Sequence, residues 1–161
     1  MERLIALIME NVPVIFYVVA WILALCHRAD YPLFSQTLLF YMLSWCVSAT
    51  GVWGFFGHVF MSERAASSIG WKTSPFQKEV GCAGLATGIL GCLTPAVPSP
   101  FWGATVIAFS IFMLGAAFFH VVEIIKYKNY SRNNAGMMLW MDILIPLTLI
   151  ITLSLSHIPV R

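Results

Sequence analysis

The chain has 161 residues, of which 60% are hydrophobic and only 10% are charged, and its mean hydropathy is +0.84. Soluble domains are about 45–50% apolar and about 25% charged. A soluble fold of this size could not bury so much apolar surface, so we expect an integral membrane protein with the lipid bilayer as its main partner. The chain has no basic tract, and its net charge is only +2, so the sequence excludes a nucleic-acid-binding protein.

Five apolar segments of roughly 20 residues, the length that crosses a bilayer, alternate with short polar or proline-containing turns. The first of them contains Glu10 and Pro13 and lacks a small-x-small cleavage site, so we expect an uncleaved spanning helix and not a signal peptide. The sequence predicts an all-α bundle, a single transmembrane domain over residues 1–161. Its expected spans are residues 4–25, 36–61, 75–93, 101–125 and 136–156.

Small residues recur every three or four positions along the second and third spans, which predicts close helix packing. The third span carries Gly81, Gly84, Gly88 and Gly91. Contacts within one chain and contacts between copies in a homo-oligomer satisfy this pattern equally. At the start of the same span, Ser74, Pro75 and Gln77 have the spacing of a helix-capping box.

The basic residues predict an orientation. With five spans, seven of the nine lysines and arginines fall on the side of the N-terminus, and only Arg28 and Arg161 fall on the other. The positive-inside rule then places the N-terminus in the cytoplasm and the C-terminus outside. We expect the protein to be a multi-pass protein of the inner (plasma) membrane.

This topology brings several ionisable side chains to one depth. Taking a rise of about 1.5 Å per residue, six of them lie within about two turns of the cytoplasmic ends of their helices. Ionisable groups inside a membrane are costly and usually face a partner or a functional cavity. The six are Glu10, His58, Glu79, His120, Glu123 and Asp142.

The residue types of this layer suit a divalent transition metal such as iron, zinc or manganese. Four-helix di-iron proteins use Glu-x-x-His pairs with further glutamates from facing helices, and His120 with Glu123 has that spacing in reversed order. The first hypothesis is therefore a metal site formed by these six residues. It would make the protein a membrane metalloenzyme, oxygen-using or hydrolytic, with metal-bound water as the reactive species.

Three other interpretations stay open. A buried carboxylate and imidazole cluster can relay protons or bind a cation in a small transporter or channel subunit. His58 and His120 could serve as axial ligands to a haem between the second and fourth spans. A purely structural role is the last, because polar residues near helix ends also cap helices or reach water.

One segment carries a resemblance. It reads Gly-His-Val-Phe-Met-Ser-Glu-Arg-Ala-Ala-Ser-Ser-Ile-Gly-Trp over residues 57–71, followed by Ser-Pro-Phe-Gln-Lys-Glu-Val-Gly over residues 74–81. It is similar to an uncharacterised family of small bacterial and archaeal membrane proteins. The resemblance covers about a fifth of the chain and implies a multi-span membrane protein without a known activity. His58 and Glu79 lie near the two ends of the matching segment, so the loop between them is expected to help build the site.

Overall fold

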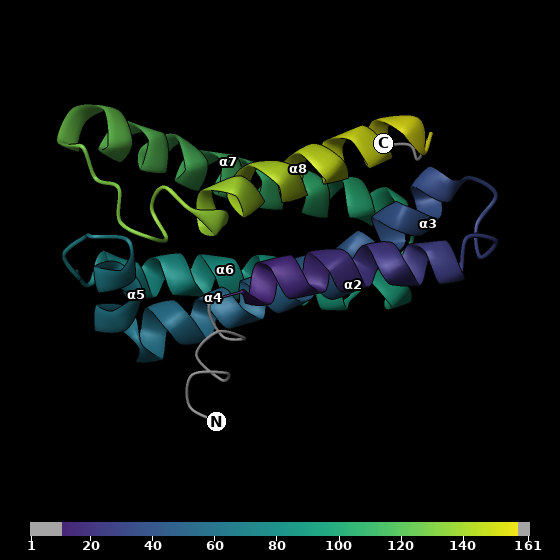
Figure 1. Cartoon of the computed structure of the whole chain (residues 1–161). Helices are drawn as coiled ribbons and strands as arrows, with labels where there is room; N and C mark the ends of the chain where they lie inside the picture. The colour runs from purple at the N-terminus through teal and green to yellow at the C-terminus, as the bar shows by residue number, and fades with distance from the viewer. Residues whose placement is uncertain (1–10, 158–161) are drawn as a thin grey trace, which may run out of the picture.

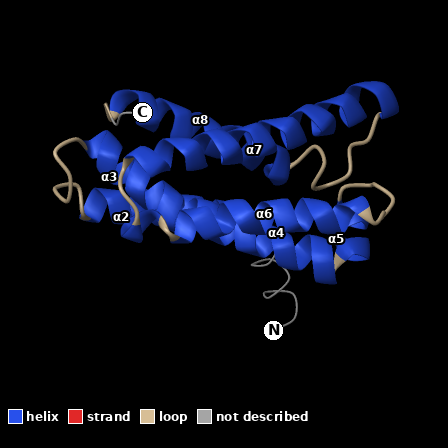
Figure 2. Ribbon diagram, turned by 180° about the vertical axis from the view of Figure 1, so that it is seen from behind, coloured by secondary structure: helices blue, strands red, loops and turns tan. Residues whose placement is uncertain are grey.

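The computed structural model describes residues 11–157, and this part of the chain consists of helices and connecting loops without a strand (Figure 2). The predicted all-α class is therefore confirmed over these residues. The helices are α2 (Val12–Cys26), α3 (Phe34–Tyr41), η1 (Met42–Val47), α4 (Ser48–Phe60), α5 (Ser62–Ser68), α6 (Phe76–Cys92), η2 (Thr94–Ala96), α7 (Pro100–Tyr127) and α8 (Met137–Leu155).

The long helices run along a common axis and form two layers (Figure 1). Helices α7 and α8 pack on each other in one layer, and α2, α4 and α6 form the other. The short helix α3 joins the layers at one end of the bundle, and α5 lies at the opposite end. The ends of α4 and α7 and the starts of α6 and α8 therefore meet near α5.

Three helical segments of the described part are long and apolar enough to cross a membrane. They are residues 34–60, which join α3, η1 and α4, together with α7 and α8. They match the expected spans 36–61, 101–125 and 136–156 within two residues at each end. Helix α2, with 15 residues, is a shorter apolar helix, and α6 has 17 residues. The predicted first span begins at residue 4, outside the described residues, so its start is not compared.

The glycines of α6 form a close contact with α4, and this contact lies within the chain. A Cβ added to Gly51 would meet the Gly84 carbonyl oxygen at 2.5 Å and the Gly88 Cα at 2.6 Å. The two backbones thus approach more closely than any side chain would allow, as small-residue pairs permit in membrane helices. The predicted helix packing is confirmed, and no second copy is needed to explain these glycines.

The second span contains one irregular turn that the sequence did not predict. Residues Met42–Val47 form a π-helical turn, in which one extra residue widens the helix. The Ser48 hydroxyl donates a hydrogen bond to the Leu43 carbonyl at 3.2 Å. Gly91 of α6 packs directly against this turn, since a Cβ there would lie 2.7 Å from the same Leu43 oxygen.

The end of the bundle near α3 is held by side chains from both layers. The Gln36 amide donates to the Ser156 carbonyl at 2.9 Å, and the Tyr17 and Thr148 hydroxyls are hydrogen-bonded at 2.9 Å. Tyr31 and Trp102 meet edge to face, with ring centroids 5.8 Å apart. These contacts tie α2 and α3 to α7 and α8 at the end remote from α5.

The capping box predicted at Ser74 and Gln77 is wrong. Helix α6 begins after Pro75 without a side-chain cap. The Gln77 amide instead donates to the Ser62 carbonyl at 2.9 Å and accepts from the Thr73 hydroxyl at 3.0 Å. The reason is the short helix α5, which brings the Ser62 carbonyl within reach of the Gln77 amide. The polar composition of this segment did not indicate a helix there.

Candidate functional site

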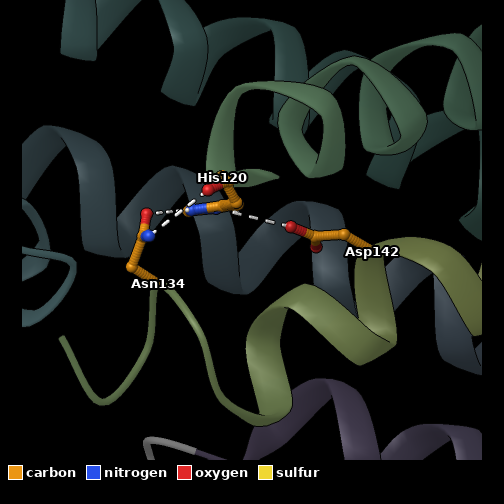
Figure 3. Close-up of polar contacts among 3 residues, drawn as sticks. All are labelled: His120, Asn134 and Asp142. Carbon is orange, nitrogen blue, oxygen red and sulfur yellow. Dashed lines mark hydrogen bonds and ion pairs between the residues drawn. The ribbon is translucent and has the colours of Figure 1, made fainter. Parts of the chain in front are cut away.

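Two of the predicted site residues, His120 and Asp142, form a buried pair between α7 and α8 (Figure 3). His120 Nε2 lies 3.6 Å from Asp142 Oδ2, and the two side chains are only 10% and 8% exposed. This distance suits an ion pair but is beyond a direct hydrogen bond, so a small closure or a bridging water completes the contact. The pair joins the fourth and fifth predicted spans.

A third residue, Asn134, fixes the protonation pattern of the histidine. Its amide nitrogen donates to the Asn129 carbonyl at 2.9 Å and to the His120 carbonyl at 3.4 Å, so its Oδ1 atom is the acceptor. That oxygen lies 2.7 Å from His120 Nδ1, which must therefore carry a hydrogen and donate it. His120 Nε2 is left to face Asp142, as Figure 3 shows.

The arrangement can hold one shared proton. With a single proton between Nε2 and the carboxylate, the pair is either neutral imidazole with carboxylic acid or imidazolium with carboxylate, and its net charge is zero in both states. A second proton makes the pair positive, and loss of the proton makes it negative. Because Asn134 already occupies Nδ1, every change of protonation passes through the side that faces Asp142.

The loop that carries Asn134 is folded back by its own sequence. Helix α7 ends at Tyr127, and the left-handed backbone of the next residue, Lys128 (φ 55°), reverses the chain. The Asn129 amide then donates to the Ile69 carbonyl at 2.8 Å, which attaches the loop to the end of α5. Gly70 has φ 74°, and a Cβ at this position would collide with Ser131 and Asn129, so only glycine fits this contact.

His58 lies at the same end of the bundle but has its own partner. The Gln77 amide nitrogen, oriented by Thr73 and Ser62, lies 3.3 Å from His58 Nδ1 and donates to it. His58 therefore carries its hydrogen on Nε2 when neutral. Residues of the predicted loop between His58 and Glu79 help build the site, because Trp71 lies against the His120 ring with the centroids 5.6 Å apart.

The sequence predicted that His120 and Glu123 act as a pair, but in the structure each side chain has other partners. Glu123 accepts a hydrogen bond from the Asn129 amide at 3.3 Å, whereas His120 faces Asp142 and Asn134. Glu79 is exposed in the first turn of α6. Glu10 lies outside the described residues.

The metal-centre hypothesis receives no support from this geometry. Among residues 11–157, no three His, Cys, Asp or Glu side chains are grouped closely enough to hold a metal ion. His58 and His120 have separate polar partners: Gln77 for His58, and Asn134 and Asp142 for His120. The five predicted residues that the structure describes, His58, Glu79, His120, Glu123 and Asp142, thus lie toward one end of the bundle without forming a ligand set among themselves.

A cavity of about 620 Å³ lies between the two layers and reaches this end of the bundle. Its walls are mainly apolar and come mostly from α4 and α7, with further residues of α5, α6 and α8. Its polar lining includes His58, Arg64, Asn133, His120 and Asp142. This size and lining are typical of a small-molecule site, in which a few polar groups orient a mostly apolar ligand.

Sequence reasoning missed Asn134, which is fully buried, and Arg64, which lines the cavity. Asn134 lies in a polar loop, where asparagine normally marks a solvated turn. Its only signal is that three asparagines occur among residues 129–134, just after a histidine-bearing span. For Arg64, the sequence indicates only a charged side chain and not a position in the wall of a cavity.

One comparison with known proteins is informative. A family model described as a family of unknown function (DUF6790) matches residues 10–160. No curated protein and no solved structure matches the chain significantly. The match extends over the whole bundle, well beyond the segment 57–81 in which the resemblance was noted.

Proposed function

The chain belongs to this family of unknown function (DUF6790), and we propose that it is a proton-translocating membrane protein of the small transporter or channel-subunit class. The observation that carries the proposal is the buried His120–Asp142 pair beside the cavity. In this proposal all five apolar segments cross the plasma (inner) membrane, with the N-terminus and the α5 end of the bundle in the cytoplasm.

Charge distribution supports this orientation. Six of the seven basic residues between positions 11 and 157 belong to α5, the first turn of α6, the end of α7 or the adjoining loops. These segments gather at one end of the bundle (Figure 1). Arg28, the seventh, lies in the turn before α3 at the other end.

Proton exchange is the chemistry that the pair performs best. Asp142 delivers a proton from the cavity to His120 Nε2, and Asn134 holds the ring so that this nitrogen keeps facing the carboxylate. The other charged or titratable groups that line the cavity are His58 and Arg64. Within residues 11–157, neither forms an ion pair or hydrogen bond with His120 or Asp142, so the pair exchanges its proton without a fixed counter-ion there.

A route toward the opposite end is supported by buried hydroxyls. Thr37 in α3, Ser44 in η1 and Ser110 in α7 each bury an oxygen that has no hydrogen-bond partner among the described residues. Such groups in membrane interiors are usually satisfied by ordered water. Ser110 precedes His120 by ten residues, about 15 Å along the helix. Water held by these hydroxyls would extend a proton path from the pair through the bundle.

The test compares two His–Asp pairs of equal length. Purified protein is reconstituted in liposomes that contain a pH-sensitive dye, and a potassium diffusion potential drives protons inward. We expect the wild type to acidify the lumen and Asp142→Asn to reduce the rate to that of protein-free vesicles. Asp30→Asn is the matched control, because Asp30 also lies 3.6 Å from a histidine, His27, but that pair is solvent-exposed.

A second measurement reports the site itself. Infrared difference spectra between two pH values should contain a carboxylic-acid band that Asp142→Asn removes and Asp30→Asn retains. Folded wild-type protein without proton flux, or equal flux in Asp142→Asn, would overturn the proposal.

A further inference from the structure

Three glycines of the cavity wall have no packing partner among residues 11–157. A Cβ added to Gly54 or Gly57 of α4, or to Gly115 of α7, would meet no atom within 4 Å. All three line the cavity. Glycine weakens a helix relative to alanine, and at Gly51 and Gly88 close helix contact accounts for it. In the described part of the chain, helix contact does not account for the other three, whose effect is to leave the space between the layers open.

The polar end of the cavity carries a net positive charge. The His120–Asp142 pair with one shared proton contributes zero, His58 is neutral when it accepts from Gln77, and Arg64 contributes +1. The Arg64 side chain is exposed and makes no ion pair with the described residues. A ligand with one anionic group would match this charge.

The volume sets the size of the ligand. At about 30 Å³ for each water-sized group, the cavity of 620 Å³ has room for roughly 20 such groups. One hydrocarbon chain with a small head fills this space, whereas a two-chain phospholipid exceeds it. The apolar walls of α4, α6 and α7 suit the chain, and Arg64 and His58 suit a carboxylate.

We propose that the cavity binds a free long-chain fatty acid, with its carboxylate at Arg64 and His58 and its chain along Gly54, Gly57 and Gly115. This inference rests on the proposed function, because it names the ligand class of the same cavity. The carboxylate head lies at the end of the cavity where His120 and Asp142 exchange their proton.

The experiment uses a photoreactive fatty acid, diazirine-labelled palmitic acid, with the full chain in nanodiscs. Mass spectrometry locates the label, and the expected sites are peptides of α4 and α7 around Gly54 and Gly115. Gly115→Leu should abolish this labelling because the new side chain fills the cavity. Val18→Leu is the matched control, since it adds a leucine to the outward face of α2, where Val18 is 48% exposed.

The head group is tested by a second variant that leaves the bundle interior unchanged. Arg64→Gln in α5 should weaken labelling by palmitic acid about tenfold, the loss expected for one charge-assisted contact. It should not change labelling by the diazirine alcohol of equal chain length. Arg28→Gln, at the opposite end, should change neither.

Equal labelling by acid and alcohol in the wild type, or unchanged labelling in Gly115→Leu and Arg64→Gln, would overturn the inference. If the protein conducts protons but its cavity is not labelled, the fatty-acid inference is refuted and the proposed proton function is retained. Cavity labelling in protein without proton flux would support the ligand and overturn the proton function.

Discussion

Removal of the Asn134 side chain tests whether the loop orients the histidine. Asn134 is fully buried and makes three hydrogen bonds through its amide, two of them to His120 and one to the Asn129 carbonyl. In Asn134→Ala, the His120 Nδ1 hydrogen and the Asn129 carbonyl lose their partners. Each unsatisfied group costs about 1–3 kcal/mol, so with two such groups we expect a loss of about 2–6 kcal/mol in the free energy of unfolding.

The free energy can be measured by titrating the folded protein in mixed micelles with sodium dodecyl sulfate. Asn133→Ala is the control, because the hydrogen bond from Asn133 to Ser68 uses the backbone N–H and survives the change. We expect this control to lie within about 0.5 kcal/mol of the wild type. If Asn134→Ala were equally mild, the argument that Asn134 holds His120 would be refuted.

The other predictions use the same titration. Gly51→Ala should lose about 1–3 kcal/mol because its Cβ overlaps the α6 backbone. Gly54→Ala, three residues later on an open face, should be neutral or gain up to about 1 kcal/mol, and equal effects at the two positions would contradict the close α4–α6 contact. Gln77→Leu should lose about 1–2 kcal/mol because the Ser62 carbonyl and His58 lose their donor. Thr73→Val removes only the exposed bond to Gln77 and should cost less than about 0.5 kcal/mol, so a larger effect than that of Gln77→Leu would count against this network.

Apolar length predicted three helices almost to the residue. The segments 36–61, 101–125 and 136–156 correspond to 34–60, 100–127 and 137–155 because a bilayer permits only long apolar stretches with internally satisfied backbones. Local irregularity was not predictable in the same way. The residues of the π-helical turn at Met42–Val47 have no composition that distinguishes them from an ordinary apolar helix. Gly91 of α6 packs against this turn, and the two meet only in the folded bundle.

The sequence predicted the depth of the site residues along their helices, but it did not predict which of these side chains contact each other. A rise of about 1.5 Å per residue places His120, Glu123 and Asp142 at similar heights, whatever the neighbouring helices are. The direction of each side chain depends on rotation about the helix axis. Glu123 follows His120 by three residues, which turns it about 60° away, toward the loop, since each residue rotates by about 100°. His120 faces α8 and meets Asp142, and Glu123 meets Asn129.

Loop contacts account for the remaining difference. Spacing rules treat residues 126–134 as a solvated basic loop, yet Asn134 is buried and Asn129 reaches α5. The contact of Asn129 with Ile69, 60 positions away, depends on the full arrangement of the layers and leaves no local pattern in the sequence.

The division of the polar residues between the two layers bears on how a proton could be moved. His120 and Asp142 both belong to the α7–α8 layer, so the pair remains intact if that layer shifts as a unit (Figure 1). His58 belongs to the other layer, in which α4 and α6 are locked by backbone contact at Gly51 and Gly88. The cavity lies between the layers, so a relative shift changes the access of the pair to the cavity without breaking either unit. A change of access at a fixed proton site is what proton translocation requires, and this is the physical reason for preferring it to a purely structural role.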